Sequence, residues 1–188
     1  MLDVYTAKAG NVLRAGGKES AYKGGNGPTD GNVVDIERAG MAKSRQRVKT
    51  RSGTEIGIDI GYGRTLRHGD ILQSGDDPRK PVVVVRQVPE KVIQLRFKGS
   101  RGGGGDGGDG SGSNREAWYE LPVIVGHIIG NRHRPVSVRR DSISFPIQDD
   151  AELETFSELL AGVSDRIDMH VTEEIFVPHS GADVHDHR

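Results

Sequence analysis

Seven histidines and no cysteine restrict the metal chemistry that is open to this chain of 188 residues. Because thiolates are absent, a transition-metal site would have to use imidazole nitrogen and carboxylate oxygen. Three of the histidines, His179, His185 and His187, lie in the last ten residues, where the apolar content is too low for a core. His185 and His187 are one residue apart, so both rings can reach the same ion. By its residues alone, this segment is either a metal-binding tail or a solvated terminus.

A further histidine, His133, follows an apolar run that ends in Gly130 and Asn131, and Pro135 comes shortly after it. Glycine and asparagine tolerate the left-handed backbone conformation that ends many helices, and proline prevents a helix from continuing. We therefore predict a helix C-terminus here, capped at Gly130 or Asn131. An imidazole at such a place either caps the helix or binds a metal, and the residues leave both interpretations open. One imidazole holds a transition metal weakly, whereas a two-fold dimer with His133 near the axis supplies two.

The overall composition excludes several classes of function. The formal net charge is -1, from 26 basic and 27 acidic residues, so the chain as a whole is not attracted to nucleic acid or membrane. No segment reaches the roughly 20 apolar residues of a membrane span, and the N-terminus lacks a signal pattern, so we expect a cytoplasmic protein. No nucleophile–base pair and no paired carboxylates stand out, so we do not expect an enzyme.

The first half of the chain predicts a β domain after a flexible start. Residues 1–31 are rich in glycine, and apart from a short strand at residues 2–6 we expect a flexible N-terminal extension. Residues 32–90 hold short apolar runs separated by turns, which is typical of a small all-β domain.

One of these strands would carry a row of basic residues on one face, namely Arg45, Arg47, Lys49 and Arg51. Such a row could bind RNA phosphates or a protein partner. Alternatively, it is a solvated face whose arginines pair with Glu55 and Asp59 on the next strand. Because no aromatic residues are interleaved for base stacking, the second interpretation is favoured.

The second half predicts the order strand, helix, strand, strand, helix, strand over residues 91–178. The helices are expected at residues 116–129 and from Asp149 to Leu160, where apolar residues recur at helical spacing. With right-handed crossovers this order gives a ferredoxin-like, split βαβ domain, so the fold class is α+β. The glycine-rich insert at 99–114 fits the G-x-G-x-x-G pattern but does not lead directly into a helix, and we interpret it as a linker.

The segment Gly130-Asn131-Arg132-His133, after an apolar helix and before Pro135, resembles the signature of the UreE family of urease accessory nickel chaperones. Other stretches occur in the order expected for that family, and the resemblance covers most of residues 32–188. They are Lys43 to Val48, Gly69 to Leu72, Leu159 to Gly162, and Phe176 to Pro178 followed by histidines.

The resemblance implies a homodimer that carries nickel for the maturation of urease. It implies a β domain similar to the peptide-binding module of Hsp40-type chaperones, followed by a ferredoxin-like metal-binding domain. His133 would hold Ni²⁺ at the dimer interface, and His179, His185 and His187 of a disordered tail at 179–188 would add ligands. Zn²⁺ is also compatible with imidazole. The implied partners are the urease accessory GTPase UreG and the apo-urease maturation complex, whereas nucleic acid and membrane are not expected.

Three histidines fall outside this ligand set. His127 lies one position from a ligand-like histidine of some relatives, and we expect it on a surface that faces solvent or the partner chain. His68 and His170 are expected to be surface or structural residues. A second internal site near residues 142–146, where some relatives carry histidines, is not expected because serine and proline stand there.

Overall fold

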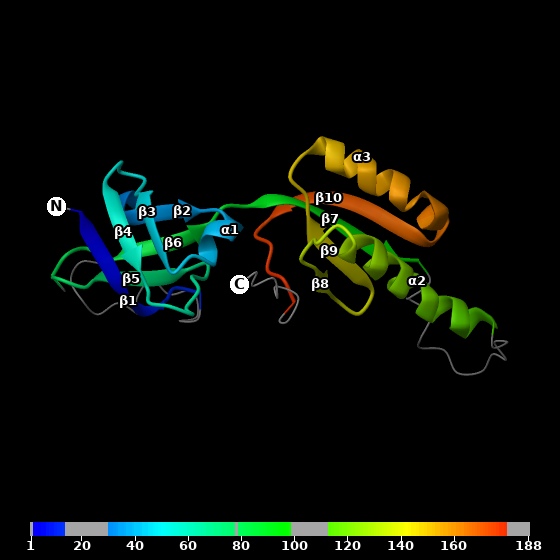
Figure 1. Cartoon of the computed structure of the whole chain (residues 1–188), viewed down its shortest axis with the longest axis horizontal. Helices are drawn as coiled ribbons and strands as arrows, with labels where there is room; N and C mark the ends of the chain where they lie inside the picture. The colour runs from blue at the N-terminus through cyan, green and yellow to red at the C-terminus, as the bar shows by residue number, and fades with distance from the viewer. Residues whose placement is uncertain (1, 14–29, 78, 99–112, 180–188) are drawn as a thin grey trace. The chain divides into compact units, whose positions relative to one another are not determined.

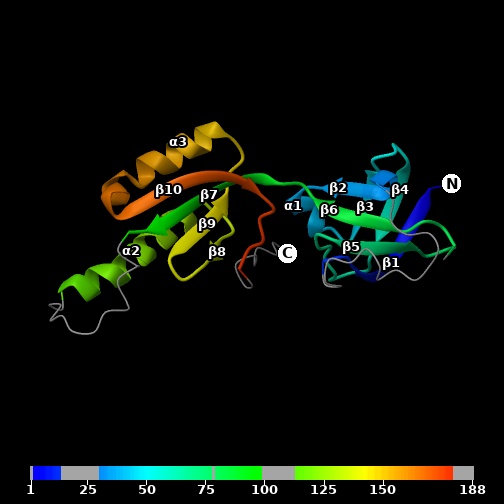
Figure 2. The ribbon, with the colours of Figure 1, turned by 180° about the vertical axis from the view of Figure 1, so that it is seen from behind.

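The computed structural model describes residues 2–13, 30–77, 79–98 and 113–179. It consists of two compact units, Met1–Val88 and Pro89–Arg188. The first holds a six-stranded sheet, and the second holds a four-stranded sheet with two longer helices (Figures 1 and 2). The chain is therefore of mixed α+β class with a β-rich first unit, as predicted. Residues 99–112 of the linker expected at 99–114 lie outside the described residues, as do residues 180–188 of the expected tail. Residues 113 and 114 are not part of a linker, because a helix begins at Ser113.

The sheet of the first unit has the strand order β2-β6-β5-β1-β4-β3. Its strands are β1 (Asp3–Asn11), β2 (Val33–Ile36), β3 (Arg45–Lys49), β4 (Glu55–Asp59), β5 (Asp70–Ser74) and β6 (Val83–Gln87). A short 3₁₀ turn, η2 (Asp30–Asn32), precedes β2, and a single helical turn, α1 (Arg38–Met41), follows it. The aliphatic side chains of these strands form one core cluster, whose most buried members include Val34, Ile56, Ile58, Leu72 and Val85.

Residues 14–29 of the expected flexible extension lie outside the described residues. Strand β1 corresponds to the strand expected at residues 2–6 but continues to Asn11. It lies inside the sheet, where it pairs parallel with β4 and antiparallel with β5. Tyr5 is 5% exposed within the core cluster, and its hydroxyl donates to the carbonyl of Pro81 at 3.1 Å. The strand was underestimated because Ala, Gly, Lys and Asn fill its second half, and those residues have little intrinsic strand preference. Its pairing partners, which are distant in sequence, supply the stability.

The sheet of the second unit has the strand order β10-β7-β9-β8, with every neighbouring pair antiparallel. Its strands are β7 (Glu90–Phe97), β8 (Ser137–Val138), β9 (Ser142–Pro146) and β10 (Ile167–Glu174). Helix α2 (Ser113–Gly130) connects β7 to β8, and helix α3 (Asp150–Leu159) with the 3₁₀ turn η3 (Ala161–Arg166) connects β9 to β10. The predicted order of strands and helices is the one observed.

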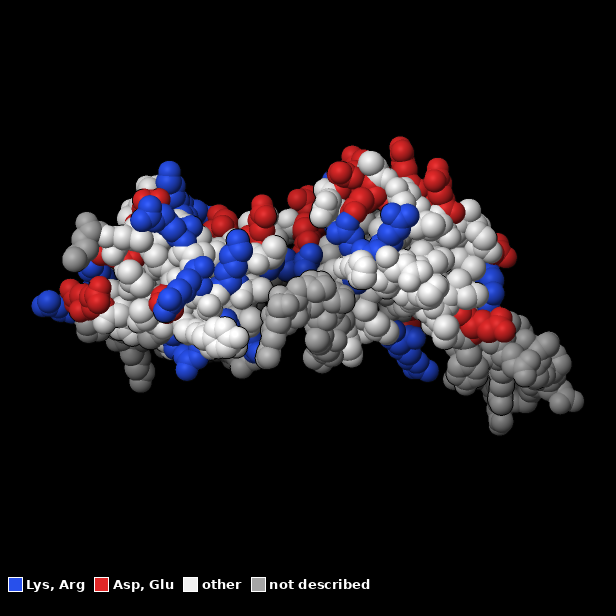
Figure 3. Space-filling model, in the orientation of Figure 1, with Lys and Arg blue, Asp and Glu red and all other residues white. Residues whose placement is uncertain are grey.

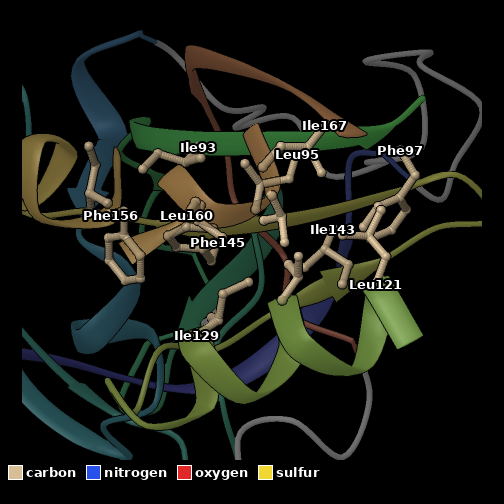
Figure 4. Close-up of a cluster of buried hydrophobic side chains, with 13 residues drawn as sticks. Ile93, Leu95, Phe97, Leu121, Ile129, Ile143, Phe145, Phe156, Leu160 and Ile167 are labelled. Carbon is tan, nitrogen blue, oxygen red and sulfur yellow. The ribbon is translucent and has the colours of Figure 1, made fainter. Parts of the chain in front are cut away.

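Both helices pack on the same face of this sheet. Alternate residues of β7 and β9, such as Ile93 opposite Phe145, point toward the helices because side chains alternate along a strand. Figure 4 shows these side chains meeting Leu121 and Ile129 of α2 and Phe156 of α3. The rings of Phe145 and Phe156 lie 4.5 Å apart between centroids, with their planes inclined by 55°. This core fixes the end of α2 relative to the beginning of α3.

Helix α2 begins earlier than the sequence indicated. It passes through Pro122, although proline lacks the N–H of an internal helical hydrogen bond. Leu121, Val125 and Ile129 are fully buried on the sheet, and this packing outweighs the local cost of the proline.

Within the described residues, no helix is long and apolar enough to cross a membrane.

The position of β1 inside the sheet can be tested by truncating Tyr5. We expect Tyr5→Ala to lower the free energy of unfolding of the first unit by about 3 kcal/mol, because a buried aromatic side chain is lost and a cavity remains. Leu13→Ala, at a side chain that is 59% exposed, should change it by less than about 0.5 kcal/mol. Urea denaturation of the full chain measures both. Equal effects of the two substitutions would show that β1 is not part of the core.

Candidate metal-binding site

The predicted site begins where helix α2 ends, and the backbone hydrogen bonds there form a complete C-cap. The amide of Arg134 donates to the carbonyl of Ile129 at 3.5 Å, and the amide of His133 donates to the carbonyl of Gly130 at 2.9 Å. This nested pair of bonds is the Schellman motif, in which the residue after the cap adopts the left-handed conformation. The motif assigns that position to His133.

His133 has a φ of 52°, the only positive φ of a non-glycine residue in the described part of the chain. The prediction that Gly130 or Asn131 would carry the left-handed cap is therefore wrong, because neither of them has a positive φ. This conformation costs a residue with a β-carbon about 1–2 kcal/mol, whereas glycine adopts it without that cost. An exposed imidazole thus occupies a position at which glycine would be more stable. Such an outlier is a reason to suspect a function.

The loop that carries His133 is attached to the start of α3. Arg134 forms an ion pair with Glu152, in which the two side chains are 18% and 26% exposed. The other carboxylate oxygen of Glu152 accepts the amide N–H of Gln148 at 2.7 Å. The side chain of Asp149 caps α3 by accepting the amide N–H of Glu152 at 3.0 Å. Acidic side chains gather over α3 in Figure 3. Among the acidic residues of this helix, Glu152 pairs with Arg134 of the loop after α2.

One part of this arrangement, the N-terminal cap of α3, is recognisable in the sequence. Asp149 with Glu152 three residues later is the pattern of a helix N-terminal capping box. No sequence signal indicated that Glu152 would also bind Arg134, because that contact depends on the shared core of α2 and α3. Arg134 is therefore a positioning residue that sequence reasoning missed.

The segment after β10 returns to the same loop. The amide of His179 donates to the carbonyl of Val136 at 2.7 Å, which places the backbone of His179 beside a residue three positions after His133. His179 is exposed. His185 and His187, the other predicted ligands, lie outside the described residues. Within residues 2–13, 30–77, 79–98 and 113–179, no three potential His or carboxylate ligands form a cluster.

The remaining histidines have other surroundings. His127 is exposed on α2, and its Nε2 lies 3.0 Å from the side-chain amide nitrogen of Asn131, one helical turn later. Since the amide nitrogen can only donate, Nε2 accepts and its lone pair is engaged. His170 lies exposed on the edge strand β10. Neither the contact of His127 nor the position of His170 indicates a further metal ligand beside His133.

His68 has a structural contact in the first unit. Its Nδ1 accepts the backbone N–H of Gln87 at 3.0 Å. Burial of the ring lowers the pKa of His68 below its ordinary value, and the neighbouring charge of Arg86 lowers it further. The neutral imidazole is therefore part of the link between β6 and the turn before β5.

The basic row on β3 forms ion pairs across its hairpin. The guanidinium of Arg45 lies 2.8 Å from the carboxylate of Asp59, and that of Arg47 lies 3.9 Å from that of Glu55. Arg51, just beyond β3, binds both carboxylate oxygens of Asp35 on β2, at 2.7 and 2.9 Å. This hydrogen bonding lowers the pKa of Asp35. The arrangement matches the solvated, paired face and offers little unpaired charge for a phosphate backbone.

Comparisons with known proteins extend these observations. Residues 22–86 match the family model described as the N-terminal domain of the UreE urease accessory protein. The chain is 32% identical over 95 residues to a urease accessory protein UreE of Bacillus cereus, covering 50% of this chain and 48% of the relative. It is 33% identical over 102 residues to a UreE of Staphylococcus aureus, covering 54% of this chain and 53% of the relative. These matches span about half the length of either relative.

A longer alignment, over 140 residues, joins the chain to a UreE of Alcanivorax borkumensis at 24% identity, covering 74% of this chain and 66% of the relative. These relatives are all urease accessory proteins. The particular protein to which this chain is similar is UreE, whose N-terminal domain model matches residues 22–86. The matching model is described as that of an accessory protein, which agrees with the prediction that the chain is not an enzyme.

The low pKa of His68 predicts how the stability of the first unit depends on pH. Because the folded pKa is depressed below the ordinary value of about 6.5, the unfolded chain binds more protons between the two values. Stability is therefore complete above about pH 6.5 and falls as the pH drops through the folded pKa. His68→Gln should remove this loss between pH 7.5 and 5.5, as measured by urea denaturation followed through the NMR signals of β6. An unchanged pH dependence in the variant would rule out His68 as its source.

Proposed function

We propose that this chain is a nickel metallochaperone that binds Ni²⁺ through His133 at a dimer interface and delivers it for the maturation of urease. The observation that carries the proposal is the exposed His133 in the left-handed position of a C-cap. Glycine adopts this backbone conformation at lower cost, so a histidine held in it is a candidate for a function. Ligation of a metal is a role that a neutral imidazole fulfils well.

We further propose that the second unit is a ferredoxin-like domain and that the first is the peptide-binding-like domain of the family. The order of strands and helices in the second unit, with both helices on one face of an antiparallel sheet, supports the first assignment. The family match to residues 22–86 supports the second.

The outer surface of α2 supports a homodimer. Val123 and Ile124 are 69% and 41% exposed on this surface, just before the His133 loop. Gly126 and Gly130 are exposed between them and the loop, and a β-carbon added at either would meet no atom within 4 Å. Packing inside one chain does not require glycine at these positions, whereas the close approach of a second copy would. Two copies meeting there would bring two His133 side chains to one axis.

The coordination sphere in this proposal is completed by His179, His185 and His187. The backbone contact of His179 with Val136 brings the start of the tail to the His133 loop. Ligands contributed by a terminal segment can leave the ion easily, which suits a protein that hands its cargo on. Imidazole accepts Zn²⁺ as well as Ni²⁺, so zinc is a competing cargo.

The partners in the proposal are a second copy of the chain, the urease accessory GTPase UreG and the apo-urease maturation complex, and the compartment is the cytoplasm. The name of the relatives, urease accessory protein, supports an assembly role around urease. The ion pairs of the β3 face favour this reading over an RNA-binding module.

The role of His133 can be tested with two substitutions that separate the ligand from the backbone. His133→Gly and His133→Ala both delete the imidazole, but only glycine relieves the left-handed conformation. We expect both variants to lose the tightest nickel site. We expect His133→Gly to be more stable than His133→Ala by about 1 kcal/mol. Calorimetric titration with Ni²⁺ and urea denaturation measure the two effects, with His170→Ala as the control that keeps nickel binding. Wild-type nickel affinity in His133→Gly would refute the site.

The dimer surface can be tested at Gly126. Gly126→Gln should favour the helix by about 0.5–1 kcal/mol within one chain, because glycine is a poor helix former. The same substitution should convert the dimer to a monomer and weaken nickel binding, because the glutamine side chain would fill the space that the second copy of the chain occupies in the proposed dimer. Gly162→Gln is the matched control, since a β-carbon at Gly162 also meets nothing within 4 Å but lies in η3. Sedimentation of a dimeric Gly126→Gln variant would contradict the assignment.

A further inference from the structure

A second polar site lies in the first unit, whereas the histidines assigned to nickel belong to the second. It is a cleft of about 480 Å³ beside the C-terminal end of β1. The residues that line it come from β1, from the loop before β5 and from the first residue of β5. They are Lys8, Gly10, Asn11, Arg64, Thr65, Arg67 and Asp70.

The floor of the cleft is organised by the carboxylate of Asp70, a residue that is only 5% exposed. One of its oxygens accepts the side-chain amide of Asn11 at 3.0 Å, and the other accepts the backbone N–H of Arg67 at 2.8 Å. The second oxygen also lies 2.6 Å from the ammonium nitrogen of Lys8. Both oxygens are therefore occupied, and Asp70 acts as a fixed internal counter-ion.

Lys8 is held in place by this carboxylate and by the carbonyl of Thr65, to which its ammonium group also donates. An ammonium group has three N–H donors, so one remains for a ligand. The side chain of Lys8 is 28% exposed, which leaves it within reach of the cleft. Its position is set before any ligand arrives, so little conformational entropy is lost on binding.

Two arginines stand at the rim of the cleft. Arg64 and Arg67 are exposed, and no side-chain hydrogen bond or ion pair joins either of them to another residue in the described ranges. With Lys8 they give the lining three positive charges against the single negative charge of Asp70. A concave surface with this imbalance attracts anions.

The lining also limits the kind of anion. It contains no aromatic or large aliphatic residue, so it offers nothing on which a nucleotide base or an apolar group could pack. Guanidinium groups bind carboxylate and phosphate with two parallel hydrogen bonds, and an ammonium adds a point charge. We propose that this cleft binds an oxyanion, a carboxylate or phosphate group, through Arg64, Arg67 and Lys8. The group comes either from a free anion or from an acidic segment of a protein partner.

The test is an NMR titration of the full chain with inorganic phosphate and, separately, with a blocked tri-glutamate peptide. We expect saturable shifts of the Asn11 side-chain amide and of the Arg67 backbone amide. The double variant Arg64→Gln/Arg67→Gln should weaken binding at least tenfold, the effect of losing one or two charge-assisted hydrogen bonds. It leaves intact the backbone N–H that Asp70 accepts, so the floor is retained. Arg47→Gln, on β3 of the same unit, removes a charge outside the cleft and is the control.

The two titrations distinguish the source of the anion. Binding of the peptide, displaced by phosphate, supports an acidic protein segment as the ligand. Binding of phosphate alone supports a free anion. Linear, non-saturating shifts with both probes would overturn the proposal, and so would an equal loss of affinity in Arg47→Gln. None of these outcomes depends on whether the chain binds nickel.

Discussion

The end of helix α2 imposes the constraint on which the proposed metal site depends. The two nested hydrogen bonds from His133 and Arg134 close the helix only if the residue at position 133 is left-handed. The imidazole therefore leaves the helix in a direction set by the backbone and not by a flexible loop. The strain of the left-handed residue is tolerated because the packed α2 and the Arg134–Glu152 pair hold both sides of it.

Two acidic residues organise the polar regions of the two units in the same physical way. Glu152 accepts the amide of Gln148 with one oxygen and binds Arg134 with the other. Asp70 accepts Asn11 and the amide of Arg67, and pairs with Lys8. In each case a carboxylate with restricted solvent access has all its oxygens satisfied, so its burial is tolerable. In this way Glu152 fixes Arg134 beside the proposed metal-binding loop, and Asp70 fixes Lys8 beside the proposed anion-binding cleft.

Much of the fold was predictable because local patterns and tertiary packing agree. The alternation of β7 and the helical spacing of α2 and α3 place the residues that form the second core. Strand β1 was only partly recognised, since Lys8 and Gly10 have weak strand preferences and their place in the sheet is set by β4 and β5. Helix α2 begins at Ser113 and not at residue 116, and this earlier start was missed because the residues up to 114 were assigned to the glycine-rich linker.

The sequence by itself determined the chemistry available to this protein: imidazole without thiolate, a helix that must end before Pro135, and a segment around His133 that resembles a family signature. It did not determine which residue takes the left-handed conformation, because Gly130, Asn131 and His133 lie within one turn and the hydrogen bonds choose between them. Nor did it indicate that Arg134 meets Glu152, or that Lys8, Arg64 and Arg67 surround one cleft. Lys8 is far along the chain from the two arginines, as Arg134 is from Glu152, and only the packing of sheets and helices brings these partners together.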